Sequence, residues 1–202
     1  YTHSTFNEFD NGATMLPGST IHALGAPTDS VVDTANQEIE DYIAALNLEP
    51  GIAQGDMNAP FSYQTAQDFT VLDFDSIAMD GDGIILNGRV GFDDTLVIRI
   101  AGDAIFENGA AVTLNNLDRR NVIWLTSDAS EFDLHRNETA NFEGIVINPT
   151  ESDQGEHTII GDVDFKGQVF AASMKLGSGM DFEGTNVPEP SGHLFFLSAF
   201  GG

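Results

Sequence analysis

Short apolar runs, separated by residues that favour turns, are the main pattern along the chain. Runs of this kind, bounded by Gly, Asn, Asp or Pro, are typical of β-strands. They fall at 69–72, 84–86, 96–100, 111–114 and 122–125. The run Leu96–Ile100 alternates, with Arg99 on the polar side, and predicts a strand buried on one face only. Val122–Leu125 is apolar throughout and predicts a strand covered on both faces.

One segment, Asp33–Leu48, follows a helical period instead. Apolar residues recur at intervals of three and four, from Val32 just before the segment through Ala35, Ile39, Tyr42, Ile43 and Leu46. Thr34 with Gln37 can form a capping box, and Pro50-Gly51 ends the pattern. We therefore expect a helix over 33–48 whose apolar stripe packs on the β-structure.

The remaining segments divide the chain into three parts. Residues 51–67 contain enough Gly, Pro, Asn and Asp to predict a loop. The predicted organisation is an extended N-terminal arm at 1–24, one domain at 25–186 that includes the helix, and an apolar, Pro-containing tail at 187–202. The apolar part of that tail is too short to cross a bilayer but long enough for one strand.

One short phrase recurs three times. An Asn or Asp, a Phe, a charged residue and a Gly occur at Asn141–Gly144, Asp164–Gly167 and Asp181–Gly184. These residue types suit the corner of a coil, with Phe pointing inward and Gly able to take positive φ, and we expect each corner to start a new strand.

Repetition of such a unit predicts stacking, because a single rung cannot cover its own apolar face. The intervals between the phrases are 23 and 17 residues, which indicates loops inserted between rungs. The predicted fold is mainly β: an irregular right-handed β-solenoid with one long α-helix packed alongside. A β-sandwich with three similar turns stays the alternative.

Charge narrows the possible partners. The chain has 7 Lys and Arg against 32 Asp and Glu, a net charge of -25. Such a surface repels phosphate backbones and anionic lipids, so we expect neither nucleic-acid binding nor electrostatic docking on a membrane. There is no Cys, hence no disulfide, thiolate metal site or Cys nucleophile.

Acidic pairs are the only candidate chemistry. Asp73, Asp75, Asp80 and Asp82 lie close in sequence near turns, and carboxylates there suit calcium, so these four are the candidate metal ligands. Solvated turn residues are the plainer interpretation. Paired carboxylates can also serve a glycosidase, but many pairs arise by chance among so many acids. With no Ser-His-Asp set and no paired His, we expect no enzyme, no catalytic residue and no bound cofactor other than calcium.

Two resemblances bear on localisation. Val-Pro-Glu-Pro-Ser at 187–191, followed by an apolar run, resembles the start of a PEP-CTERM sorting signal, without its transmembrane helix and basic cluster. The region 69–184 resembles the choice-of-anchor A domain of bacterial surface proteins, through the phrases at 95–103, 120–124, 142–149 and 165–173. Together they imply an extracellular or cell-surface bacterial protein handled by exosortase-type sorting machinery. The chain is more distantly similar to ice-binding β-solenoids, although its Thr residues form no ladder.

Two functional hypotheses follow. The first is an exported structural protein of the surface or extracellular matrix that associates with itself into a fibre or sheath, because the open ends of a β-stack invite pairing. The residues proposed for that contact are Leu194, Phe195, Phe196, Leu197 and Phe200. The alternative is a monomeric adhesin or carbohydrate- or ice-binding module. It needs outward aromatic side chains, for which Tyr42, Tyr63 and Trp124 are candidates, although Trp124 lies in an apolar run and is expected in the core.

Overall fold

The computed structural model of the chain describes residues 14–15, 30–127, 130–136, 141–149, 158–171, 174–177 and 181–184. Apart from β1 (Thr14–Met15), the predicted arm lies outside these residues, and so does the whole predicted tail. Strands make up most of the described part, and the paired strands are parallel throughout. Helix α1 (Ser30–Leu48) is the only α-helix that the described residues contain.

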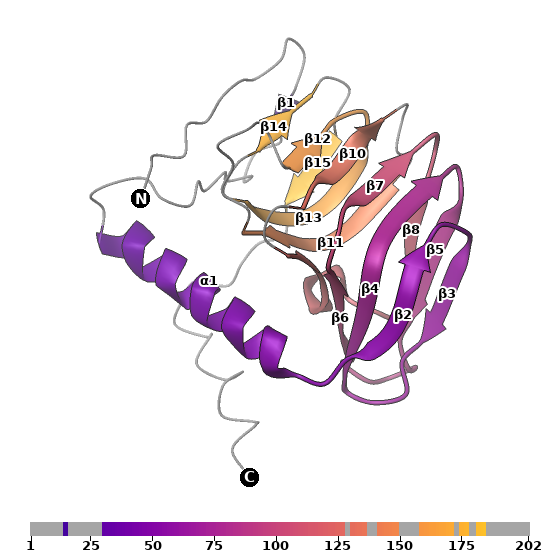
Figure 1. Cartoon of the computed structure of the whole chain (residues 1–202), viewed down its shortest axis with the longest axis horizontal. Coiled ribbons are helices and arrows are strands. Elements are labelled where there is room, and N and C mark those ends of the chain that lie inside the picture. Colours follow the sequence, from indigo (N-terminus) through magenta and orange to yellow (C-terminus); the bar gives the residue numbers. More distant parts are fainter. Residues whose placement is uncertain are drawn as a thin grey trace.

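The strands wind into a coil with three faces (Figure 1). The first face stacks residues 69–74 of β4 (Phe69–Asp80), β6 (Thr95–Ile100), β9 (Val122–Thr126) and the second halves of β11 (Asn141–Asn148) and β13 (Asp164–Ala171). The second face stacks residues 77–80 of β4, β7 (Ala104–Glu107), β10 (Phe132–Arg136), β12 (Thr158–Ile160) and β14 (Lys175–Leu176). The third face stacks β3 (Phe61–Gln64), β5 (Gly83–Asn87), β8 (Ala111–Asn115), the first halves of β11 and β13, and β15 (Asp181–Gly184).

Stacked parallel coils of this kind form a β-solenoid, which confirms the predicted fold class and replaces the β-sandwich alternative. The two ends of the stack differ. β2 (Ile52–Met57) lies against β4 at one end, while β1 pairs with β15 at the other. Helix α1 extends along the side of the stack towards β2 (Figure 1).

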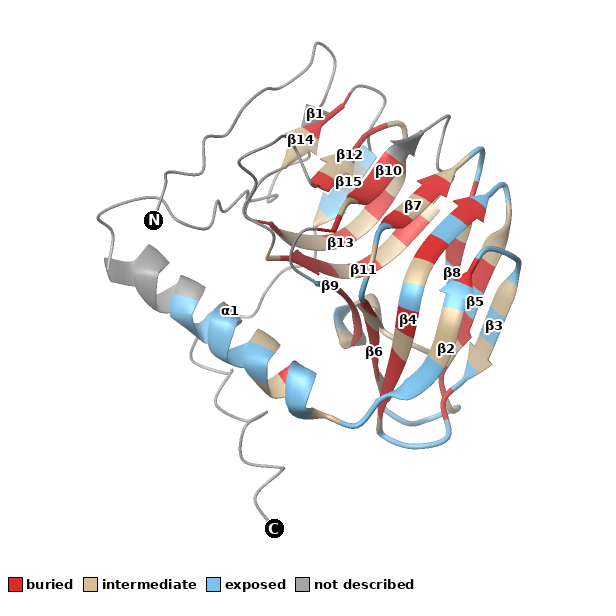
Figure 2. Ribbon diagram, viewed as in Figure 1, coloured by how far each residue is buried: buried red, intermediate tan, exposed pale blue. Residues whose placement is uncertain are grey.

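The helix covers the outer side of the first face. Leu46 is buried in a cluster with Val71, Val97 and Ile123, and Ile43 packs against the same cluster. Val122 and Trp124 face the interior core, while Ile123 and Leu125 face the helix side, so every residue of β9 is buried (Figure 2). This confirms the prediction for Val122–Leu125. The prediction of one-sided burial for Leu96–Ile100 is wrong, since Val97 faces the helix and is fully buried.

Two predicted boundaries were also wrong. The helix begins at Ser30, so Thr34 lies inside it and is not its N-cap residue. The predicted loop at 51–67 contains β2 and β3. Its turn-forming residues are compatible with strands there because both strands lie at the end of the stack. Gly55 has φ of 75° and marks a bulge where the register of β2 on β4 shifts.

The three copies of the recurring phrase stack on the third face, as expected, and the structure shows that they lie in register. Phe142 and Phe165 point into the core and stack with their ring centroids 5.7 Å apart. Gly144 and Gly167 are paired at the following corner, where a Cβ on Gly167 would lie 1.7 Å from the carbonyl oxygen of Gly144. Each phrase starts a strand, as expected, since β11, β13 and β15 begin at its first residue. The four residues belong to the strand itself, and β11 and β13 continue through the corner onto the first face.

The unequal spacing of the phrase has a single source. Nine residues, 149–157, separate β11 from β12, whereas three residues, 172–174, separate β13 from β14. The difference of six equals the difference between the intervals of 23 and 17 residues. The insertion therefore lies between the first and second faces and leaves the stacked strands in register.

Candidate binding face

The third face presents an uncharged outer surface over three neighbouring strands. On β3, β5 and β8 the alternation places Phe61, Ile84 and Val112 towards the core. The outward residues are aligned across the strands in two rows. We call these six residues the neutral ladder: Ser62, Ile85 and Thr113 in one row, and Gln64, Asn87 and Asn115 in the other.

Hydrogen bonds between the rungs hold the amide row in place. Asn115 Nδ2 donates to Asn87 Oδ1 over 3.0 Å, and Asn87 Nδ2 donates to the carbonyl oxygen of Tyr63 over 3.0 Å. Gln64 Nε2 donates to the carbonyl oxygen of Asn87 over 3.2 Å. These amides are therefore oriented before any ligand arrives, which reduces the entropy lost on binding.

The other half of the same face carries charges. Glu143, Lys166 and Glu183 are aligned on β11, β13 and β15. Lys166 Nζ lies 3.1 Å from Asp164, whose hydrogen bond raises the pKa of the lysine. Arg119 lies 2.9 Å from Glu183 and lowers the pKa of that carboxyl group. The third face is thus divided into a neutral part and a charged part.

A β-turn follows the neutral ladder directly. Phe92 N donates to the carbonyl oxygen of Arg89 over 3.3 Å, and Gly91 has φ of 81°, as the third position of a type II turn requires. The turn exposes two apolar side chains, Val90 at 80% and Phe92 at 59%. Sequence reasoning missed this aromatic residue, although Gly91 beside two apolar residues is a turn signal.

A buried carboxylate anchors the turn. The side chain of Asp94 is fully buried and accepts hydrogen bonds from Arg89 N over 2.8 Å and Arg89 Nε over 3.0 Å. Thr65 Oγ1 donates to the same carboxylate over 2.5 Å, and Asp68 forms a second ion pair with Arg89. The Arg89 hydrogen bonds hold the pKa of Asp94 well below its usual value, while the carboxylates raise the pKa of Arg89.

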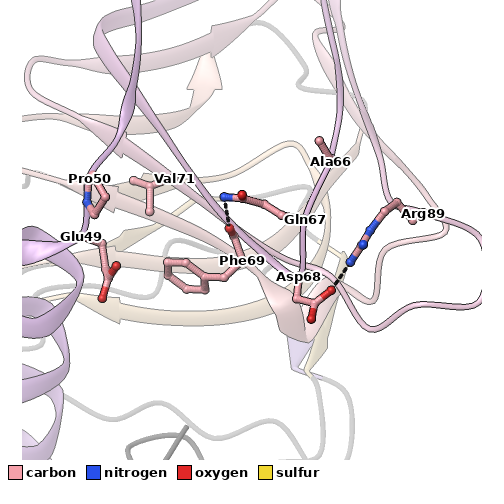
Figure 3. Close-up of a pocket in the computed structure, with 8 residues that line it drawn as sticks. All are labelled: Glu49, Pro50, Ala66, Gln67, Asp68, Phe69, Val71 and Arg89. Carbon is pink, nitrogen blue, oxygen red and sulfur yellow. Dashed lines mark hydrogen bonds and ion pairs between the residues drawn. The ribbon is translucent and has the colours of Figure 1, made fainter. Parts of the chain in front are cut away.

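A groove of about 500 Å³, lined in part by Arg89, lies between the end of α1 and the start of β4 (Figure 3). Its lining residues are Glu49, Pro50, Ala66, Gln67, Asp68, Phe69, Val71 and Arg89. The lining carries two carboxylates, and that of Asp68 is already paired with Arg89. Gln67 Nε2 donates to the carbonyl oxygen of Phe69 over 2.7 Å.

The four predicted calcium ligands are spread over more than one face. Asp73 lies on the first face and binds Arg99 through two hydrogen bonds of 2.6 and 2.9 Å. Asp75 is exposed beyond that face, Asp80 ends the second face and accepts from Asn108 Nδ2 over 2.6 Å, and Asp82 precedes β5. Among the described residues no three His, Cys, Asp or Glu side chains form a group that could hold a metal. Calcium binding stays a prediction.

The other candidates are placed as follows. Trp124 is fully buried, as expected, with Nε1 donating to the carbonyl oxygen of Glu143 over 3.1 Å. Tyr63 packs against the core, and Tyr42 is 39% exposed on α1. The residues predicted for self-association, Leu194, Phe195, Phe196, Leu197 and Phe200, lie outside the described residues.

Comparison with models of protein families shows which family the chain belongs to. The model of the family described as "Putative Ice-binding-like adhesive domain" matches residues 2–183. The chain belongs to this family.

The adhesive domain defined by that match includes α1 and nearly all of the solenoid. The similarity to ice-binding β-solenoids expected from the sequence is thereby confirmed at the level of the family. No curated protein and no solved structure matched the chain. Within the described part of this adhesive domain, no helix is long and apolar enough to span a bilayer.

Proposed function

We propose that this adhesive domain works outside the cell, at the surface or in the surrounding matrix, and binds a neutral, hydroxyl-rich surface such as ice or a polysaccharide. The neutral ladder is the proposed contact. The observation that carries this proposal is the absence of charge from its six outward positions on a chain whose net charge is -25. The adhesive family favours a binding function over a catalytic one.

The physical reason lies in the cost of removing water. A neutral amide or hydroxyl loses far less hydration energy than an ion when a surface covers it. Neighbouring rungs lie about 4.8 Å apart and outward residues along one strand about 6.7 Å apart, so the ladder is a fixed array of donors and acceptors. Ile85, which is 42% exposed, adds apolar contact area at the centre of this array.

The test compares two variants with the same change in net charge. Thr113→Lys places a cation within the neutral ladder. Asp181→Asn removes an exposed carboxylate that is aligned with Asp164 in the charged half of the same face. Adsorption of the purified domain to polycrystalline ice and to insoluble polysaccharides is measured for both variants and the wild type. We expect Thr113→Lys to reduce adsorption at least about tenfold, because the contact would have to remove water from an unpaired charge. Asp181→Asn should adsorb as the wild type does.

Equal adsorption by both variants would refute the ladder as the contact, and so would a wild-type domain that adsorbs to neither material. Circular dichroism of each variant establishes that the fold is intact, which separates lost contact from lost structure.

Self-association is the second candidate function. It rests on the end of the stack, where β2 and β3 each pair with one strand only in the described part. The bulge at Gly55 and the exposed Asp56 make that edge less suited to pairing, so we rank assembly below adhesion. The PEP-CTERM tail, the exosortase partner and the choice-of-anchor A relationship stay predictions. Light scattering on the full chain and on a chain that ends at residue 186 would detect assembly through the tail.

A further inference from the structure

The β-turn at Arg89–Phe92 carries an aromatic ring that contributes little to the core. Phe92 is 59% exposed and Val90 is 80% exposed, whereas the large aromatic residues Trp124, Phe106, Phe132, Phe142 and Phe165 are fully buried. An aromatic side chain that stays in water forgoes the free energy that burial would give. A contact with a ligand would account for its position.

The ring is held in place rather than left free. The guanidinium carbon of Arg89 lies 4.2 Å from the centroid of the Phe92 ring, a cation–π contact. Arg89 is itself fixed by Asp94, whose side chain is fully buried. The ring therefore loses little further conformational entropy when a ligand binds to it.

The turn and the neutral ladder share their supporting residues. Thr65, which follows Gln64 of the ladder, donates to Asp94 at the base of the turn. Thr65 N also donates to the carbonyl oxygen of Asn87 over 2.9 Å. Arg89 follows Asn87 by two residues. The amide row and the exposed ring are thus parts of one rigid corner of the molecule.

We infer that Phe92 is a stacking platform for a sugar ring and that the ligand of this face is a neutral polysaccharide. This inference rests on the proposed function and specifies its substrate class. The face of an aromatic ring carries partial negative charge and attracts the weakly positive C–H groups on the apolar side of a sugar. The oriented amides of Asn87 and Asn115 then bind the sugar hydroxyl groups.

The charges beside the turn restrict the ligand further. Asp93 is exposed and accepts from Asn121 Nδ2 over 2.6 Å, and the side chain of Asp68 is 86% exposed. Carboxylates can accept hydrogen bonds from sugar hydroxyl groups but repel uronic-acid and sulfated polymers. A neutral polysaccharide fits this site, and an acidic one does not.

The test is affinity gel electrophoresis of the full chain in gels that contain soluble glucan, mannan or xylan, with alginate as the anionic comparison. Retardation by at least one neutral polymer and none by alginate is expected. Phe92→Ala should weaken binding to that neutral polymer at least about tenfold, and Phe92→Tyr should stay within about threefold of the wild type because it keeps the ring. Val90→Ala, which alters an apolar side chain of the same turn without removing a ring, should change binding less than about twofold.

Three results would overturn the inference. If Phe92→Ala binds as the wild type does while Thr113→Lys loses binding, the ladder is the contact and the Phe92 ring is not part of it. An equal loss in Val90→Ala would indicate general apolar contact rather than stacking. Adsorption to ice that depends on Thr113, with no retardation by any neutral polymer, would refute the substrate class and leave the proposed adhesive function standing.

Discussion

Arg99 joins helix α1 to the stack, and its replacement is the most informative test of that contact. Its Nη1 donates to the carbonyl oxygens of Leu46 and Glu49 over 2.9 and 3.0 Å, at the end of the helix. Nε and Nη2 bind the carboxylate of Asp73 on the neighbouring rung. One side chain thus satisfies carbonyl groups at the helix C-terminus and places a positive charge there.

The expected magnitude follows from these contacts. Arg99→Met keeps the aliphatic stem and removes all four hydrogen bonds. The partly exposed ion pair contributes roughly 1 kcal/mol, and the charged donor at the helix end adds about 1–2 kcal/mol. A total of about 2–3 kcal/mol corresponds to a fall in Tm of roughly 4–12 °C for a chain of this size.

Urea denaturation followed by circular dichroism measures this loss. Arg120→Met is the matched control, because Arg120 is exposed and binds only Asp118, two residues away, among the contacts described. Its unfolding midpoint should stay close to that of the wild type. A midpoint for Arg99→Met that equals the wild-type value would refute the view that Arg99 holds the helix on the first face.

Three further predictions concern the corner, the turn and the aspartates. Gly167→Ala should lower the free energy of unfolding by more than about 4 kcal/mol or prevent folding, because its Cβ would lie 1.7 Å from the Gly144 carbonyl oxygen. Gly109→Ala, which has open space around it, should lower the free energy of unfolding by about 1 kcal/mol. Thermal denaturation of both variants measures the difference. The lowered pKa of Asp94 means that its stabilising effect is complete above the unfolded-state pKa of about 3.9 and is lost as pH falls towards the folded-state value. The Tm of the wild type should therefore fall more steeply below about pH 4 than that of Asp94→Asn, and parallel curves would contradict this. Calcium binding by Asp73, Asp75, Asp80 and Asp82, as the sequence predicts, should raise the Tm of the wild type in proportion to the logarithm of calcium concentration, and a Tm that calcium leaves unchanged would contradict that prediction.

The solenoid could be predicted because its repeating phrase consists of consecutive residues and is therefore visible in the sequence. Phe142, Phe165 and their neighbours recur with the same residue types. Close approach of neighbouring atoms requires Gly at 144 and 167. The apolar stripe of 33–48 likewise predicted a helix that packs on the stack. β2 was missed because a strand at the end of a stack tolerates Gly55 and a bulge, which in the sequence resemble a loop.

The candidate binding face could not be predicted from the sequence. Ser62, Ile85 and Thr113 are neighbours in space but lie 23 and 28 residues apart in the sequence. Because these intervals differ, no repeat of fixed length in the sequence identifies the three residues as neighbours. Their alignment depends on the register between neighbouring strands, which cannot be read from the sequence because the loops between the strands differ in length. Arg99 was assigned to the polar side of its strand, yet its contact with the helix end joins residues about 50 positions apart.

Hydroxyl-radical footprinting of the domain, free and bound to a neutral polysaccharide or to ice, tests the central claim most directly. Ile85 and Phe92 report on the neutral ladder and its turn, while Tyr42 and Leu48, which are also exposed, report on the helix side. The account predicts that binding protects Ile85 from oxidation and leaves Tyr42 and Leu48 unchanged. Protection of Tyr42 and Leu48 with none at Ile85 would contradict it.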